Sequence, residues 1–251
     1  MSVYAASDWH GCYWVWEKVK EILRPQDKLY FLGDAADRGP DGWRMIKELL
    51  SDPRITYIKG NHEDLLIKAI GNYTPKEDKE DYFWDKNMEV WFRNGAEPTY
   101  NAFCDDPNEE EKVKILKQIK TLPFCANYVN TQELNIFMCH AGCEGDDIGN
   151  LSEYNAIWDR NHWLFPDTWY GDDNTIIIHG HTPISAMIKE QEFHTRYLGT
   201  KGKYISMPKY SIGAYWYGRG HKICIDTKTF WDNIAILFNL DTYEEIYITK
   251  V

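Results

Sequence analysis

The sequence lacks the features that mark membrane-spanning and secreted chains. No apolar run approaches the roughly 20 residues that a membrane-spanning helix needs. The stretch IAILF at 234–238 is among the longest apolar runs. The amino-terminal stretch MSVYAASDWHG is charged by position 8 and contains no hydrophobic signal-peptide segment. We therefore expect a soluble, cytoplasmic protein with no membrane partner.

The sequence also lacks closely spaced cysteine pairs, and its acidic residues outnumber its basic ones, 39 to 28. The six cysteines include no CxxC pair and no zinc-ribbon spacing, which predicts reduced thiols in place of a disulfide framework or a structural zinc site. The formal net charge of −11 argues against general nucleic-acid binding, because such binding needs Lys and Arg to neutralise phosphates. A local basic pocket remains compatible with this charge.

Core-forming residues, by contrast, are abundant. Of the 251 residues, 43% are hydrophobic and 15% are aromatic, which predicts one α/β domain over residues 1–251. Strands and helices are expected to alternate up to residue 70, and this indicates a parallel sheet covered by helices. A helical insertion is expected at about 71–122. The expected strands are 2–8, 28–34, 55–60, 124–130, 134–140, 175–179, 221–226, 233–240 and 244–251. The expected helices are 13–23, 40–50, 62–70, 82–93 and 109–122.

Residues with metal-binding side chains stand where these strands end, each beside a glycine. The motifs are SDWHG, GDAADRG and GNHE after the first three strands, and CHAG and GHT after two later ones. Because the carboxyl ends of parallel strands lie along one edge of a sheet, we expect the motif side chains to meet there. The residues concerned are Asp8, His10, Asp34, Asn61, His62, His140 and His181.

This set offers carboxylate, amide and imidazole ligands but no thiolate. Such ligands suit divalent Mn, Fe or Zn, held in a catalytic site with open positions. More than four candidate ligands indicate two metal ions. Asp34 follows the middle one of the first three strands and is the natural bridge between the ions.

Each motif taken alone also has an ordinary structural interpretation. A turn aspartate beside a histidine occurs in many proteins without a metal, and Asn61 could simply cap a helix. His140 alone would more often be structural than a ligand. Five such segments, each at an expected strand end, reduce the chance of coincidence to about a few per cent.

In this order, the five motifs resemble the metallophosphoesterase (calcineurin-like) superfamily. The Asp-Arg-Gly form of the second motif resembles its phosphoprotein phosphatase branch. The stretch GDAADRGPDG…YIKGNHEDLL is similar to small bacterial and phage serine/threonine protein phosphatases, and to relatives that hydrolyse symmetric dinucleoside tetraphosphates. The resemblance is dense over 2–70 and shorter over 134–182 and 222–251. It implies a calcineurin-like fold, with a central β-sandwich flanked by helices and a helical insertion.

The resemblance also implies a role for each motif residue. One metal ion would be held by Asp8, His10 and the bridging Asp34. The second would be held by Asp34, Asn61, His140 and His181. The two ions are expected to be Mn, with Fe or Zn as alternatives. The substrate phosphate would be contacted by Arg38, Asn61 and Arg160, the last of these in IWDR. The general acid would be His62, with Asp37 as its orienting partner.

Three features are left open by the sequence. His179 lies two positions before His181 in HGH, and the Gly-His-Thr pattern of the family favours His181 as the ligand. The stretch Asp226-Thr227-Lys228 departs from the Asp-Thr-Gly that is common in the family, which affects the turn there but no metal ligand. The aromatic clusters at 167–172 and 214–220 could form a wall for substrate or stack a base, or could equally be packing residues.

The function implied by the resemblance is hydrolysis of phosphate monoesters by a metal-bridging hydroxide. Phosphoserine and phosphothreonine in proteins are the first candidate substrates, and small phosphoesters are also expected to fit. The alternative is hydrolysis of dinucleoside tetraphosphates or other nucleotides, including phosphodiesters. A non-catalytic scaffold is disfavoured because every motif position is filled. Substrate choice depends on loops outside the motifs, so the fold alone does not decide it.

Overall fold

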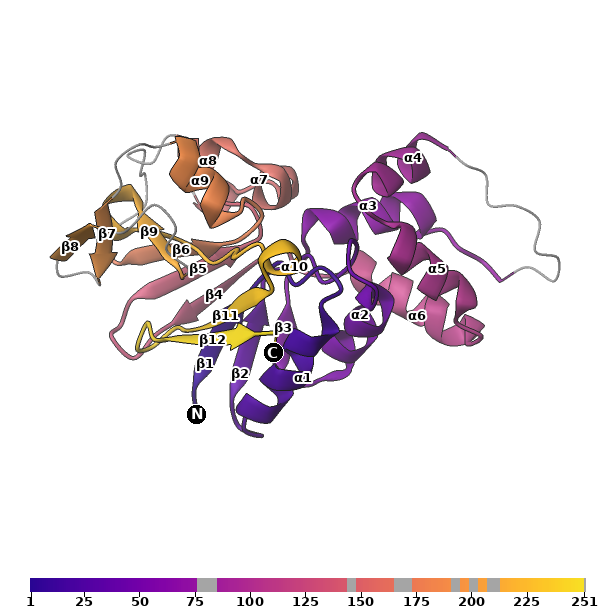
Figure 1. Ribbon diagram of the computed structural model, residues 1–251, viewed down its shortest axis with the longest axis horizontal. Helices are drawn as coiled ribbons and strands as arrows, with labels where there is room; N and C mark the ends of the chain where they lie inside the picture. The colour runs from indigo at the N-terminus through magenta and orange to yellow at the C-terminus, as the bar shows by residue number, and fades with distance from the viewer. Residues whose placement is uncertain are drawn as a thin grey trace.

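The computed structural model describes residues 1–75, 85–143, 148–164, 173–190, 195–198, 203–206 and 213–250. Two five-stranded sheets form its centre, and helices flank them (Figure 1). This confirms the predicted fold class. The described helices include none that is both long and apolar enough to cross a membrane.

The first sheet joins the two ends of the chain. Its spatial order is β12 (Glu245–Thr249), β11 (Ile234–Asn239), β1 (Val3–Ala6), β2 (Lys28–Phe31) and β3 (Ile55–Tyr57). The pairs β1–β2 and β2–β3 are parallel, as the alternating sequence pattern predicts. The pairs β1–β11 and β11–β12 are antiparallel. For β11 and β12 this follows from their short hairpin connection, which parallel strands cannot have.

The second sheet is built from the later half of the chain. Its order is β4 (Cys125–Val129), β5 (Asn135–Cys139), β6 (Thr175–His179), β10 (Lys222–Cys224) and β9 (Tyr215–Tyr217). Strands β5, β6 and β10 run parallel, and the two edge strands run antiparallel to their neighbours. A separate two-stranded sheet contains β7 (Thr195–Leu198) and β8 (Lys203–Ser206).

A shared hydrophobic core lies between the two five-stranded sheets. Ala5 and Phe238 enter it from the first sheet, while Ile136 and Ile178 enter it from the second, and all four are buried. Every residue of β1 and β6 is buried, as expected for strands covered on both faces. The strand ends are thereby held in fixed positions relative to one another.

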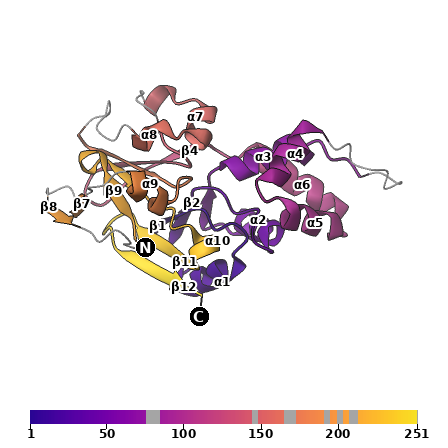
Figure 2. The ribbon, with the colours of Figure 1, turned by 45° about the horizontal axis from the view of Figure 1, so that its top comes forward.

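Helices α1 (Tyr13–Ile22), α2 (Gly42–Ser51) and α3 (Asn61–Ile70) follow β1, β2 and β3 in turn. They pack against the other face of the first sheet, where Val15, Val19 and Ile46 join Leu29 in a second core. Figure 2 shows α1 and α2 beside this sheet and α3 close to the helices of the insertion. The three connections from strand to helix all lie at one edge of the sheet.

The segment expected to be an insertion contains α4 (Lys86–Arg93), α5 (Glu97–Asp105) and α6 (Glu109–Lys120). Asp85 begins α4 as an N-cap, because its carboxylate accepts hydrogen bonds from the backbone N–H groups of Asn87 and Met88. The first part of the helix expected at 82–93 lies outside the described residues. The remaining helices are η1 (Ile148–Asn150), α7 (Glu153–Trp158), α8 (Asn161–Leu164), α9 (Ile184–Glu190), η2 (Gly218–Gly220) and α10 (Thr229–Asp232).

Candidate active site

The loops after β1 and β2 are joined directly through their backbones. The N–H of His10 donates to the carbonyl of Asp34 at 2.9 Å, and the N–H of Gly11 donates to the carbonyl of Ala35 at 2.7 Å. Gly39 lies so close to this pair that a Cβ there would come within 2.8 Å of the Gly11 carbonyl carbon. A glycine is therefore required for the second motif to reach the first.

Left-handed backbone is concentrated in these loops. A positive φ is uncommon for non-glycine residues, costs about 1–3 kcal/mol and persists only where the surroundings enforce it. Six of the ten predicted site residues adopt it: Asp8, His10, Asp34, Asp37, Arg38 and His181. These six are more than half of the eleven described non-glycine residues with a positive φ, so much of the backbone strain lies at the predicted site.

Asp34 lies at the centre of the site. Its Oδ2 is 3.7 Å from His10 Nε2 and 3.8 Å from His62 Nε2, and its Oδ1 is 3.4 Å from His140 Nε2. Among the described residues, two groups could hold a metal ion, and Asp34 belongs to both. One group adds His10 and His62, and the other adds His140 and His181. This is the arrangement that a bridging carboxylate requires.

The second group gathers around Asn61, the first residue of α3. Its Oδ1 is 2.9 Å from His140 Nε2 and 2.8 Å from His181 Nδ1. The amide oxygen, two imidazole nitrogens and a carboxylate oxygen of Asp34 thus converge, and each can donate a lone pair. His181 Nε2 is buried and has no hydrogen-bond partner among the described residues.

The histidine tautomers suit metal binding. His10 Nδ1 donates to the carbonyl of Ala36 at 3.0 Å, and His140 Nδ1 donates to the carbonyl of Leu32 at 2.7 Å. Each bond directs Nε2 into the site, where the neutral ring presents its lone pair. Metal-binding histidines are commonly oriented by such a bond from the other ring nitrogen. The donor set therefore fits divalent cations.

The electrostatics of the site also favour added positive charge. Burial alone would lower the pKa of His140, but the nearby carboxylates of Asp34 and Asp8 raise it to about 10. Burial would raise the pKa of Asp34, yet the charges of His140 and His62 hold it well below the usual value. Burial, together with repulsion from neighbouring cations, keeps the pKa of His10 and His181 low. Their neutral rings are the form that binds metals.

Asp8 faces this cluster from the end of β1. Its Oδ1 is 3.9 Å from His10 Nε2, and its Oδ2 accepts hydrogen bonds from the Ser7 hydroxyl and from the backbone N–H of His181 at 3.0 Å. The pKa of Asp8 is raised, mainly by burial and also by repulsion from Asp34, although the charge of His140 acts in the opposite direction. The bond from Asp8 to the His181 backbone connects the first sheet to the second at the site.

His62 and Asp37 form a buried pair beside Asp34. His62 Nδ1 donates to Asp37 Oδ2 at 2.7 Å, and neither side chain is more than 1% exposed. Burial alone would lower the pKa of His62, but Asp34 and Asp37 raise it above the ordinary value. The imidazole is therefore prepared to hold a proton near the metal-ligand cluster.

The helical insertion holds this pair in place. Trp91 of α4 donates its indole N–H to Asp37 Oδ2 at 2.8 Å, and the Asp37 backbone N–H donates to Thr99 Oγ1 of α5 at 2.8 Å. The N–H of Arg38 donates to the carbonyl of Gly95 at 2.8 Å. The sequence left the role of the insertion open, and these contacts show that it supports the Asp37–Arg38 turn.

The two arginines lie at different distances from the centre. Arg38 Nη2 is 3.1 Å from His62 Nε2, and its Nη1 contacts His10 Nε2, so this guanidinium borders the candidate metal ligands. Arg160 is exposed, and its Nη1 reaches Thr182 Oγ1 at 3.4 Å, next to His181. Both cations are within reach of the cluster, on separate elements.

His179 points away from the cluster. Its Nε2 is 2.6 Å from the hydroxyl of Tyr217, and its ring packs edge-on against His162. His181, in contrast, turns its Nδ1 towards Asn61. The geometry thus agrees with the choice of His181 as the candidate ligand.

Glu63 is a site residue to which sequence reasoning assigned no role. Its buried carboxylate accepts hydrogen bonds from the backbone N–H groups of Asp34 at 2.8 Å, Ala35 at 3.0 Å and Gly60 at 2.9 Å. The Tyr57 hydroxyl donates to it at 2.8 Å. The glutamate of GNHE, at the third position of α3, was the available signal, because glutamate there commonly reaches back to the helix start.

Of the two aromatic clusters, the one at 214–220 is mostly core. Tyr215, Trp216 and Tyr217 are each at most 7% exposed, so they are closed to a substrate. The cluster at 167–172 lies outside the described residues. Packing is therefore the correct interpretation for the three aromatic residues of β9.

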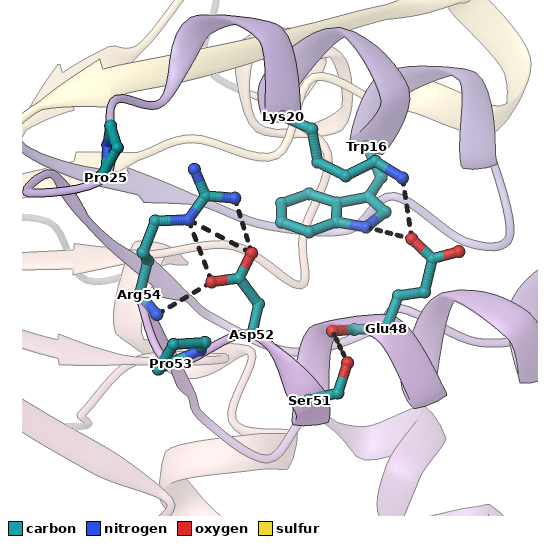
Figure 3. Close-up of a pocket in the computed structure, with 8 residues that line it drawn as sticks. All are labelled: Trp16, Lys20, Pro25, Glu48, Ser51, Asp52, Pro53 and Arg54. Atoms are coloured by element: carbon teal, nitrogen blue, oxygen red, sulfur yellow. Dashed lines mark hydrogen bonds and ion pairs between the residues drawn. The ribbon is translucent and has the colours of Figure 1, made fainter.

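A surface hollow lies at the opposite edge of the first sheet, near the starts of β2 and β3 (Figure 3). Its charged side chains are already paired: Arg54 binds Asp52 at 2.6 Å and Lys20 binds Glu48 at 2.8 Å. Trp16 donates its indole N–H to the same Glu48 at 2.9 Å. The hollow offers no group comparable to the cluster around Asp34.

Comparisons with known proteins agree with this geometry. The asymmetrical bis(5'-nucleosyl)-tetraphosphatase of Anoxybacillus flavithermus is 28% identical over 208 residues, which cover 70% of this chain and 77% of the relative. A solved structure of a candidate diadenosine tetraphosphatase has a TM-score of 0.61 at 13% identity, covering 100% of this chain and 94% of that one.

A serine/threonine protein phosphatase from Saccharomyces cerevisiae has a TM-score of 0.56 at 12% identity, covering 100% of this chain and 80% of that one. At such identities the two solved structures show a shared fold and nothing finer. The family model described as calcineurin-like phosphoesterase matches residues 1–221. The chain therefore belongs to the calcineurin-like phosphoesterase family, the metallophosphoesterases that its five motifs resemble.

Proposed function

We propose that this metallophosphoesterase hydrolyses dinucleoside tetraphosphates with the help of two divalent cations. The observation that carries the reaction class is the position of Asp34, which two separate groups of candidate ligands share. The named relative that aligns with 70% of the chain favours a dinucleoside tetraphosphate as the substrate.

The residues divide into ligands and substrate-binding groups. The first ion would be bound by His10 and Asp34 together with Asp8, whose Oδ1 is 3.9 Å from His10 Nε2, while His62, the third member of that group, is kept for proton donation. The second ion would be bound by Asp34, His140 and His181, with the amide oxygen of Asn61. When bound, such a pair of cations lowers the pKa of a water molecule and neutralises charge on the phosphate oxygens. Mn is the proposed metal, with Fe and Zn as alternatives, since carboxylate, amide and imidazole ligands suit all three.

The remaining residues act on the substrate directly. Arg38 and Arg160 would bind the phosphate oxygens from two sides, with the bidentate geometry that a lysine cannot offer. Asn61 would contact the phosphate as well. His62 would donate a proton from Nε2 to the departing oxygen, while Asp37 holds Nδ1 and fixes the orientation of the ring.

One observation supports a second candidate, the phosphoserine and phosphothreonine phosphatase suggested by the motifs. An alkoxide leaving group needs a proton far more than a phosphate leaving group, whose own pKa is about 6. The His62–Asp37 pair supplies such a donor, with the His62 pKa raised. We rank it second because the yeast protein phosphatase shares only the fold with this chain.

The test compares substrates on one protein preparation. Metal-reconstituted protein is assayed with a dinucleoside tetraphosphate, phosphoserine peptides, p-nitrophenyl phosphate and cyclic nucleotides, with Asp34→Asn as the control. We expect the highest kcat/KM on the dinucleoside tetraphosphate and loss of turnover in the control. Preference for the phosphopeptides would replace the proposed substrate by the second candidate. If the protein hydrolyses none of these substrates faster than the control does, the enzyme proposal fails and the protein is better explained as a binding scaffold.

A further inference from the structure

An exposed tryptophan borders the candidate active site on the short helix α10. Trp231 is 49% exposed, whereas Trp9, Trp16, Trp43 and Trp91 are all almost completely buried. Its ring centroid lies 4.8 Å from the guanidinium carbon of Arg38. In Figures 1 and 2, α10 lies in the middle of the molecule, near the loops that lead from β1 and β2 into their helices.

Arg38 connects Trp231 to the chemistry. One edge of its guanidinium contacts His62 Nε2 at 3.1 Å, and the indole of Trp231 lies against its face. The indole is therefore one guanidinium away from the proposed proton donor. A group attached to a phosphate that Arg38 binds would therefore lie next to this ring.

The turn that carries Trp231 is held in a defined shape. Lys228 and Asn233, which flank α10, both have left-handed backbone, with φ of 62° and 53°. The N–H of Lys228 donates to Asp226 Oδ1 at 2.7 Å, and Thr227 Oγ1 donates to the carbonyl of Ile234 at 2.7 Å. Lys228 stands where the family commonly has glycine, so this turn keeps its left-handed conformation with a charged side chain added.

That side chain adds a second cation beside the indole. Lys228 Nζ lies 5.7 Å from the ring centroid of Trp231 and 4.0 Å from Asp232 Oδ1. Phe230 packs edge-on against the indole at 5.3 Å between ring centroids, which supports the ring from within α10. Trp231, Phe230, Lys228 and Arg38 thus form a rim beside the candidate site. This rim combines an exposed aromatic surface, supported from behind, with two cations.

A ligand that matches this rim carries an aromatic ring and several phosphates. Bases of every kind stack on tryptophan, because each has a π-face. Polyphosphate oxygens match Arg38 and Lys228. A phosphoserine or phosphothreonine peptide would supply the phosphate but no aromatic ring at a fixed distance from it, so of the two candidate substrates a nucleotide matches Trp231 better.

We propose that Trp231 is the residue on which this site stacks a nucleobase of its substrate, with Arg38 and Lys228 binding the adjoining phosphates. The inference rests on the proposed function, because it assumes that the phosphate bound at Arg38 belongs to a nucleotide. It adds a determinant of substrate choice that lies outside the five motifs.

The test measures binding, so that it does not depend on turnover. Metal-loaded protein is titrated calorimetrically with a hydrolysis-resistant diadenosine tetraphosphate whose bridging oxygens are methylene groups. The second ligand is the corresponding methylene-bridged polyphosphonate without nucleosides. Trp231→Ala is expected to weaken binding of the first ligand by about tenfold to a hundredfold and binding of the second by less than about twofold. Trp231→Phe, which keeps a ring, is expected to lose less than Trp231→Ala.

Tyr247 provides the matched control, because it is also 49% exposed but lies on the edge strand β12. Tyr247→Ala is expected to bind both ligands as the wild type does. Equal weakening of both ligands by Trp231→Ala would overturn the inference, since the tryptophan would then only hold Arg38. Unchanged binding of both ligands would overturn it too.

The inference and the proposed function can fail separately. A wild type that binds the dinucleotide analogue through Trp231, yet does not hydrolyse diadenosine tetraphosphate, would refute the proposed function and support the stacking role. A wild type that hydrolyses diadenosine tetraphosphate, while Trp231→Ala binds the analogue normally, would refute the stacking role and leave the proposed function intact.

Discussion

Trp91→Phe tests how the helical insertion contributes to the site. The substitution keeps a buried ring but removes the indole N–H that donates to Asp37 Oδ2 at 2.8 Å. Asp37 Oδ1 has no hydrogen-bond partner among the described residues, so the carboxylate would then be held mainly by His62. We expect Asp37 to lose its fixed orientation and His62 to lose efficiency as an acid.

The magnitude follows from the hydrogen bond and from the acid. Losing a buried hydrogen bond to a charged group, plus some ring volume, should lower the free energy of unfolding by about 2–4 kcal/mol. General acid catalysis contributes about 10²- to 10⁴-fold in rate. An imperfectly oriented His62 should lose about a tenth to a half of the logarithm of this rate factor. The loss should be large for alkyl phosphates, and small for p-nitrophenyl phosphate, whose leaving group needs little protonation.

The assay is kcat/KM across phosphate esters of increasing leaving-group pKa, with thermal unfolding measured in parallel. Trp43→Phe is the matched control, because Trp43 is also buried and donates its indole N–H to a carboxylate, Asp106 Oδ2, at 2.9 Å. We expect both variants to lose stability but only Trp91→Phe to depend more steeply on the leaving group. Parallel kinetics in the two variants would refute a positioning role for Trp91.

Substitutions of His62, Glu63 and Asp27 have effects that differ in kind, on catalysis, on stability and on the pH dependence of stability. His62→Asn should impair phosphoserine peptides far more than p-nitrophenyl phosphate, and equal losses in kcat/KM would argue against His62 as the acid. Glu63→Gln replaces a carboxylate that three backbone N–H groups bind, so the thermal midpoint should fall by about 4–12 °C; an unchanged midpoint would contradict this role. The pKa of Asp27 lies below its usual value, chiefly because the Arg24 side chain donates hydrogen bonds to the carboxylate. Burial opposes this effect, and backbone N–H groups add to it. Asp27 therefore stabilises the fold above its unfolded pKa of about 3.9, and this contribution is lost as the pH falls through the lower folded value. Asp27→Asn should cost about 1 kcal/mol at pH 7 and nothing in strong acid, as urea unfolding at several pH values would show.

Much of the site was predictable because its signals are local. Each of the first three strands ends directly in its motif, and parallel pairing of β1, β2 and β3 brings the three ends to one edge. The fold class followed from the same alternation together with the family resemblance. Sequence order alone could not show that β11 inserts next to β1 in an antiparallel direction.

The contacts that orient the site were harder to predict because they join distant parts of the chain. Thr99 binds the backbone of Asp37 across 62 residues, and Trp91 reaches the same residue across 54. No periodicity or motif marks such a partner. Trp231 was missed for a related reason: its position in a short turn shows no pattern, and only the fold brings it next to Arg38.

Metal stoichiometry in wild type and in Asp34→Asn tests the proposed two-metal site most sharply. Calorimetric titration of metal-free protein with Mn²⁺, followed by a hydrolysis assay on the same samples, measures binding and turnover together. We expect two ions per wild-type chain. For Asp34→Asn we expect weaker binding of each ion and loss of hydrolysis, because Asp34 belongs to both groups of candidate ligands. A single ion in the wild type, or an Asp34→Asn variant that binds two ions and hydrolyses substrate normally, would contradict this proposal.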